Sequence, residues 1–217
     1  MRFIDPRRAA IPLLAAALLA GCSAPQPKPP SAPQPAAAKP AMPTPAAAPA
    51  AGHEPSTAVK KQFAKAVSAM QDGKDKQATD LFTEIAKQDP QLASPHTNLG
   101  ILLYREGRLP EAETAFKEAL QRSDKDYVAA NYLGMIYRIQ GRFAEAQAAY
   151  EQALAAKPDY AYAHLNMAIL YDLYMGKLDQ ALDHYQQYQQ SVSDADPRLA
   201  GWLADLQQRM KNTGASQ

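Results

Sequence analysis

The stretch YVAANYLGMIYRIQGRFAEAQAAYEQALAAKPDY, residues Tyr127–Tyr160, decides the fold, because its pattern recurs along the chain at a fixed step. Pairs made of a large apolar residue and a small one lie 34 residues apart, at Leu99-Gly100, Leu133-Gly134 and Met167-Ala168. Single glycines take the same step, at Gly73, Gly107 and Gly141. A constant period of this length indicates a repeat protein, in which each unit is one supersecondary element.

A second pattern follows in each unit: an alanine, an aromatic residue four positions later, and a further apolar or aromatic residue three positions after that. Its copies are Ala78, Phe82 and Ile85; Ala112, Phe116 and Ala119; Ala146, Tyr150 and Ala153; and Ala181, Tyr185 and Tyr188. Small residues let two helices approach closely, so we expect Phe116 and Tyr150 to fill the space beside Gly100 and Gly134. One unit cannot bury its own apolar face, and consecutive units must therefore stack.

These residues resemble the tetratricopeptide repeat. The resemblance implies an all-α, right-handed superhelical solenoid of four helix–turn–helix units, at residues 59–92, 93–126, 127–160 and 161–194. In each unit we expect two antiparallel helices joined at a glycine. Pro90 and Pro158 are expected just past the end of a second helix, because proline cannot continue a helix. The resemblance also implies a concave groove that binds a protein partner.

The first and last units depart from the pattern. The first has a lysine–alanine pair at positions 65–66, as expected of a terminal unit that faces solvent. In the fourth unit Tyr171 and Ala181 are ten residues apart, whereas Tyr137 and Ala146 are nine apart in the third. One residue has been inserted around LYDLYMGK, which predicts a longer first helix or a looser turn.

Beyond the last unit, residues 195–211 predict one more helix. Its apolar residues recur at helical spacing, at Leu199, Trp202, Leu203, Leu206 and Met210. Asp196 and Pro197 supply a helix start signal. We expect this helix to cap the open end of the solenoid; the alternative is that it recruits a partner through an exposed Trp202. The tail, residues 212–217, is expected to fray.

The N-terminus predicts export to the cell envelope. Arginines precede a 12-residue apolar stretch, Ala9–Ala20, which is typical of a secretory signal peptide, here residues 1–21, and is too short to span a membrane. The segment LAGC ending at Cys22 resembles the bacterial lipobox, which implies a Gram-negative lipoprotein with its lipid on Cys22. Ser23 resembles the signal for outer-membrane delivery, so we expect a lipid-anchored protein facing the periplasm. The alternative is a secreted protein without lipid.

A proline-rich segment follows the cysteine. Residues 23–58 contain 11 of the 18 prolines and 12 alanines, but no Leu, Ile, Val, Phe, Tyr or Trp. Together with Cys22 they form a predicted disordered tether, residues 22–58, because they cannot bury enough apolar surface to offset the entropy of ordering. The composition favours a spacer over the alternative, a proline-rich ligand for a partner domain.

The sequence offers little support for chemistry. Residues 59–217 carry a net charge of −2 with histidine neutral, which gives no basic face for nucleic acid. His96 and His164 occupy the same place in their units, and we expect both to be partly buried. Neither has a cysteine or second histidine one helical turn away, and no phosphate loop or nucleophile elbow is present. We therefore expect no catalytic residue, metal, cofactor or small-molecule substrate.

The resemblance assigns the residues that face inward along the groove. In units two to four these are Thr97, Ile101, Tyr104, Arg105, Asn131, Met135, Arg138, Tyr162, Leu165, Ile169 and Asp172. This mixture of apolar, aromatic and polar side chains suits an extended or helical peptide. The alternative for each residue is a place in the core.

These features predict an outer-membrane adaptor that binds a protein partner and assists assembly of an envelope complex. The architecture is similar to that of small lipoproteins that help assemble type IV pilus secretins or dock cell-wall enzymes. Two alternatives stay open. One is a structural lipoprotein that forms a homo-oligomer through its fourth unit and the Trp202 helix. The other is a glycan- or peptidoglycan-binding domain that uses the tyrosines of that end, Tyr160, Tyr162, Tyr171, Tyr174, Tyr185 and Tyr188.

Overall fold

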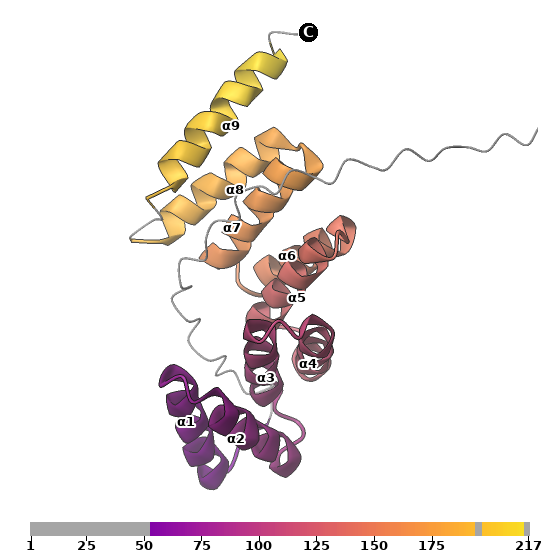
Figure 1. Cartoon of the computed structure of the whole chain (residues 1–217), viewed down its shortest axis with the longest axis vertical. Helices are drawn as coiled ribbons and strands as arrows, with labels where there is room; N and C mark the ends of the chain where they lie inside the picture. Colours follow the sequence, from indigo (N-terminus) through magenta and orange to yellow (C-terminus); the bar gives the residue numbers. More distant parts are fainter. Residues whose placement is uncertain (1–52, 194–196, 215–217) are drawn as a thin grey trace, which may run out of the picture. The chain divides into compact units, whose positions relative to one another are not determined.

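The computed structural model describes residues 53–193 and 197–214, which form helices and connecting turns without any strand (Figure 1). Four helix pairs follow one another: α1 (Thr57–Gln71) and α2 (Asp75–Gln88), α3 (Ala93–Arg105) and α4 (Leu109–Arg122), α5 (Tyr127–Ile139) and α6 (Phe143–Ala156), and α7 (Ala161–Leu170) with η1 (Tyr171–Met175) and α8 (Leu178–Ser191). The last helix is α9 (Leu199–Gly214). The predictions on the signal peptide, Cys22 and most of the tether lie outside the described residues.

Each helix pair packs within itself and against the next pair. Helix α2 contacts α3, α4 contacts α5 and α6 contacts α7, while α5 also contacts α3 and α7. Contacts between consecutive units define a solenoid. The predicted all-α repeat solenoid with an additional C-terminal helix is therefore confirmed.

A glycine in the left-handed conformation lies between the two helices of every pair. The φ angles are 74° at Gly73, 76° at Gly107 and Gly141, and 65° at Gly176. Glycine adopts this conformation at no steric cost, because it has no Cβ. The 34-residue step of the first three glycines thus reflects the backbone of the turn, and Gly176 comes one residue late because of the insertion in the fourth repeat.

The inserted residue is accommodated as a π-helical turn. Residues Tyr171–Met175 form η1, which continues directly from α7. A π-helical turn holds more residues than an α-helical turn, so the chain absorbs an insertion without breaking the helix. The predicted lengthening of the first helix is confirmed. The turn places Asp172 in the interior and Leu173 on the surface.

The predicted contacts between glycines and rings are present within the repeats. A Cβ on Gly100 would lie 2.7 Å from Cε1 of Phe116, and one on Gly134 would overlap the ring of Tyr150. Both rings are fully buried. The absence of a side chain at each glycine therefore makes room for an aromatic ring of the partner helix, as predicted.

The fold begins earlier than predicted. Helix α1 starts at Thr57, and Ser56 caps it by accepting a hydrogen bond on Oγ from the Val59 amide at 3.2 Å. His53 Nε2 lies 2.7 Å from the Asp89 carboxylate. Residues 53–58, which were assigned to the disordered tether from their composition, therefore have defined positions on the first repeat. A serine N-cap stabilises the first turn of a helix, which explains the earlier start.

Helix α9 packs against α8 and buries Leu199 and Leu206. It begins at Leu199 and continues to Gly214, beyond the predicted end of the helix at residue 211. A hydrogen bond of 3.1 Å from Gln208 Nε2 to Asn212 Oδ1 supports this last turn. Among the described residues, no helix combines the length and apolar character needed to cross a membrane.

Candidate partner-binding face

One row of side chains on the first helices of the repeats is exposed along its whole length. Its members lie 34 residues apart, at Gln71, Arg105, Ile139 and Leu173, and we call them the first-helix row. Ile139 is 47% exposed and Leu173 is 44% exposed; in the part of the chain that the structure describes, these are the two exposed large apolar side chains. Ile139 belongs to α5 and Leu173 to η1, which continues α7, and α5 contacts α7.

Ile139 and Leu173 are not among the groove residues predicted from the sequence. Arg105, the member of the same row in the second repeat, is among them. Adding 34 residues once leads from Arg105 to Ile139, and twice to Leu173. The repeat period therefore contained the signal.

Five of the predicted groove residues are buried: Thr97, Ile101, Asn131, Ile169 and Asp172. Thr97 Oγ1 donates a hydrogen bond of 2.5 Å to Asp126 Oδ2, and Asn131 Oδ1 accepts one of 3.0 Å from Asn166 Nδ2. The first bond reaches the residue that caps α5, and the second joins the third repeat to the fourth. These five side chains lie in the packing between helices and offer little surface to a partner; the groove as a whole stays a prediction.

The other predicted residues keep part of their surface. Arg105 is exposed, and five are half-buried: Tyr104, Met135, Arg138, Tyr162 and Leu165. Tyr104 packs edge-on against Tyr132 with ring centres 5.3 Å apart. The Arg138 guanidinium lies 5.7 Å from the centre of the Tyr174 ring, and its Nε is 3.5 Å from Tyr150 Oη. Tyr104 and Arg138 each directly precede a member of the first-helix row, Arg105 and Ile139.

Tyr104 and the tyrosines that contact Tyr104 and Arg138 are uncharged at neutral pH. Burial raises the pKa of Tyr104, and it raises the pKa values of Tyr132 and Tyr150 to about 12. Burial alone would lower the pKa of Arg138, but its interactions with Tyr150 and Tyr174 outweigh that effect and raise the pKa. Arg138 therefore keeps its positive charge beside two neutral phenols.

The acidic member of the predicted groove is engaged by the last helix. Arg209 Nη2 lies 2.5 Å from Asp172 Oδ1, and Tyr185 Oη donates to Asp172 Oδ2 at 3.4 Å. The Asp172 side chain is only 4% exposed. Asp172 therefore holds α9 against the fourth repeat rather than presenting a charge to a partner.

The aromatic residues of the C-terminal end serve mainly as packing. Tyr160, Tyr171, Tyr185 and Tyr188 are buried, whereas Tyr162 and Tyr174 are half-buried. The expectation of a tyrosine-rich surface for glycan is therefore wrong for four of the six rings. Trp202 is half-buried, 6.2 Å from the Tyr185 ring and with the Arg198 guanidinium 5.3 Å from its own ring. Its contacts support the role of α9 as a cap.

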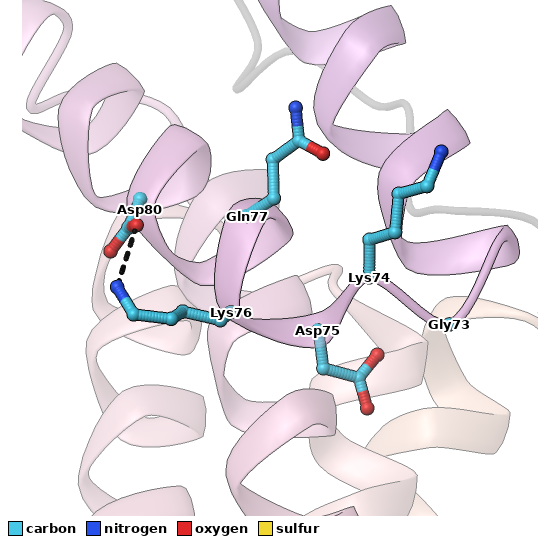
Figure 2. A pocket seen from close by; sticks show the side chains of 6 residues that line it. All are labelled: Gly73, Lys74, Asp75, Lys76, Gln77 and Asp80. Atoms are coloured by element: carbon cyan, nitrogen blue, oxygen red, sulfur yellow. Dashed lines mark hydrogen bonds and ion pairs between the residues drawn. The ribbon is translucent and has the colours of Figure 1, made fainter.

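A surface depression at the turn between α1 and α2 has no chemical organisation. It is lined by Gly73, Lys74, Asp75, Lys76, Gln77 and Asp80 (Figure 2). Lys76 forms an ion pair with Asp80 at 3.3 Å, one helical turn away, and Figure 2 shows Asp75 pointing away from Lys74 and Gln77. These side chains do not converge on a common point, so the depression supplies no catalytic arrangement.

Two histidines that lie far apart in the sequence meet in the fourth repeat. His164 Nδ1 of α7 is 3.0 Å from His184 Nδ1 of α8. His164 is buried, as predicted from its register, and so is His96. The pair was not predicted from the sequence, because the two histidines lie on different helices and not one turn apart on the same helix. Residues 53–193 and 197–214 contain no group of three or more His, Cys, Asp or Glu side chains arranged to hold a metal.

Comparison with known families supports the class of protein that this geometry defines. The tetratricopeptide repeat family matches residues 63–127, 97–161 and 133–197 in three overlapping segments. The chain belongs to the tetratricopeptide repeat family, whose members are typically scaffolds for protein–protein interaction. No curated protein matches the chain in sequence.

Several solved structures share the fold. PilF of Pseudomonas aeruginosa is 21% identical, with a TM-score of 0.63 over 71% of this chain and 70% of that one. MamA from Desulfovibrio magneticus RS-1 is 19% identical, with a TM-score of 0.60 over 74% of this chain and 91% of that one. TTC0263, a thermophilic tetratricopeptide repeat protein of Thermus thermophilus, is 23% identical, with a TM-score of 0.55 over 68% and 80% of the two chains. At these identities the similarity establishes the fold alone.

Proposed function

We propose that this protein is an outer-membrane-anchored adaptor of the periplasm that binds a protein partner through its first-helix row. The lipobox-like segment at Cys22 supports the anchor, and the proline-rich tether supports a domain held at a distance from the membrane. The fold, which is typical of scaffolds, supports binding rather than catalysis. The envelope complex that we propose it helps assemble is a type IV pilus or secretion system; the similarity to PilF agrees with that proposal but extends to the fold only.

The exposed apolar pair, Ile139 and Leu173, carries the proposal of a binding face. The two residues occupy equivalent positions on adjacent first helices. Packed helices have axes about 8–10 Å apart, which sets the approximate separation of equivalent side chains. An amphipathic helix with apolar residues seven positions apart spans about 10.5 Å. A partner helix with two such apolar residues would cover the pair, and an acidic residue on the same helix would lie near Arg105.

The binding face is tested by recovery of the partner on immobilised protein. The double variant Ile139→Asp with Leu173→Asp places two charges on the apolar pair and should reduce recovery of the envelope partner by at least about tenfold, since apolar anchors dominate such interfaces. Ala148→Asp is the matched control, because Ala148 is exposed on the second helix α6. Equal recovery with the double variant and the control would refute the binding face.

The anchor is tested separately. Replacement of Cys22 by Ser removes the thiol that would carry the lipid. Without the lipid, the variant lacks the proposed membrane anchor. We expect the variant to move from the membrane fraction to the soluble periplasmic fraction while keeping its helical circular dichroism spectrum. Retention in the membrane fraction would refute the lipid anchor without bearing on the binding face.

A further inference from the structure

The Nδ1 atoms of His164 and His184 face each other, and a backbone carbonyl fixes the orientation of the His164 ring. His164 Nε2 lies 2.8 Å from the carbonyl oxygen of Pro158, a geometry in which Nε2–H donates to that carbonyl. A neutral imidazole has one protonated and one unprotonated nitrogen. The hydrogen bond to Pro158 therefore leaves Nδ1 of His164 with a lone pair, which accepts a hydrogen bond of 3.0 Å from His184 Nδ1–H. A metal ion bound by both Nδ1 atoms would take the place of the proton on His184.

This arrangement has the features of a ligand pair for a metal ion. Histidines that bind metals commonly donate their other ring N–H to a backbone carbonyl, which fixes the ring and directs the ligand nitrogen. Metal–nitrogen distances of about 2.0–2.1 Å place two ligands about 2.9 Å apart at a right angle and about 3.4 Å apart in a tetrahedron. The observed 3.0 Å is close to the right-angle value, which suits the octahedral or square geometries of Ni²⁺ and Cu²⁺.

The pair can be reached from solvent on one side, because His184 is half-buried. The Tyr171 ring stands 5.6 Å from the His184 ring and closes another side. Water molecules would complete the coordination, because the described residues add no third histidine or carboxylate at ligand distance.

We propose that His164 and His184 form a two-imidazole binding site for a divalent transition-metal ion of the Ni²⁺ or Cu²⁺ type, which links α7 to α8 in the fourth repeat. Imidazole ligands select such ions over Mg²⁺ and Ca²⁺, which prefer oxygen. A ligand that binds only the folded state raises the unfolding temperature in a concentration-dependent manner. The proposal is independent of the adaptor function.

The test is titration of the full chain with NiCl₂, followed by calorimetry and thermal unfolding. All samples carry Cys22→Ser, because the single cysteine would otherwise bind metal. We expect one Ni²⁺ per chain, a raised unfolding temperature, and no effect of MgCl₂ at the same concentrations. His184→Asn should weaken binding by at least about tenfold, since it removes one of two protein ligands.

His53→Asn is the matched control, because His53 is a partly exposed histidine outside the fourth repeat, with Asp89 as its partner. This variant should bind Ni²⁺ as the parent does. Circular dichroism without metal establishes that each variant is folded. The proposal is overturned by any of three results: no binding by the parent, equal binding by folded His184→Asn, or loss of binding in His53→Asn.

Discussion

Gly100 lies against the ring of Phe116 so closely that a Cβ at this position would stand 2.7 Å from Cε1. The ring cannot retreat, because it is fully buried and stacks on Tyr132 with ring centres 5.1 Å apart. Tyr132 belongs to the next repeat. The glycine thus fixes the distance between α3 and α4 and, through the two rings, the position of α5.

Replacement of Gly100 by Ala should destabilise the protein by about 1–3 kcal/mol, because the added methyl group overpacks a filled interior. Urea denaturation, followed by circular dichroism at 222 nm, measures the change. Gly201→Ala is the control: Gly201 is exposed in helix α9, with no atom within 4 Å of the added Cβ. That substitution should stabilise the helix by about 0.5–1 kcal/mol. Similar effects of both changes would contradict the role of the Gly100–Phe116 contact.

Arg209→Ala should loosen the last helix. The substitution leaves the buried Asp172 carboxylate without its cationic partner, which should cost about 1–3 kcal/mol given that Arg209 itself is partly exposed. Hydrogen exchange of the α9 amides should accelerate. The same arginine also pairs with Asp205, which is 69% exposed. Asp205→Ala should therefore change stability by at most about 0.5 kcal/mol; an effect equal to that of Arg209→Ala would refute the account.

Protonation of His96 should destabilise the folded protein in acid. Burial lowers the pKa of His96 from its ordinary 6.5, and Arg122 lowers it further, although Glu118 opposes both. His96 Nδ1 lies 2.8 Å from Glu118 Oε2, whereas its buried Nε2 has no hydrogen-bond partner. A proton on Nε2 would therefore lack an acceptor. The unfolded state binds this proton more readily, so the contribution of His96 to stability is present above about pH 6.5 and declines below it.

The measurement is the free energy of unfolding in urea between pH 7.5 and pH 5. His184 titrates in the same window, because burial and the neighbouring His164 lower its pKa. The contribution of His96 is isolated by the difference between the parent and His96→Gln, which has no titrating group. This difference should change by up to about 1.4 kcal/mol per pH unit below pH 6.5. A difference that is constant with pH would contradict the assignment.

The repeat period made most of the fold predictable. A 34-residue step can be read from the sequence alone. The turn glycines and buried rings follow this step because each repeat packs against its neighbours in the same way. The sequence shows the inserted residue as a spacing of ten positions in place of nine. It does not show that the insertion forms a π-helical turn. One extra residue can be accommodated as a π-helical turn or in a longer loop. In this chain it forms the π-helical turn η1, which packs against α8.

The candidate face was less predictable. Family positions identify the side of a helix that faces inward, but Thr97 and Asn131 are buried there. Thr97 donates a hydrogen bond to Asp126, and Asn131 accepts one from Asn166 of the next repeat. The pairing of Asp172 with Arg209 joins residues 37 positions apart, outside any periodic pattern. The contact between His164 and His184 also joins residues whose separation follows no periodic pattern. Each depends on how two particular helices face each other, which periodicity does not specify.

Site-specific photo-crosslinking tests the central claim most directly. A photoreactive phenylalanine analogue replaces Ile139, Leu173 or, as control, the exposed Ala148, and the protein is irradiated in intact cells of its source organism. If the first-helix row is the docking face, as we propose, the same envelope protein is captured at positions 139 and 173 and not at 148. Capture at 148 alone, or equal capture at all three positions, would contradict the account.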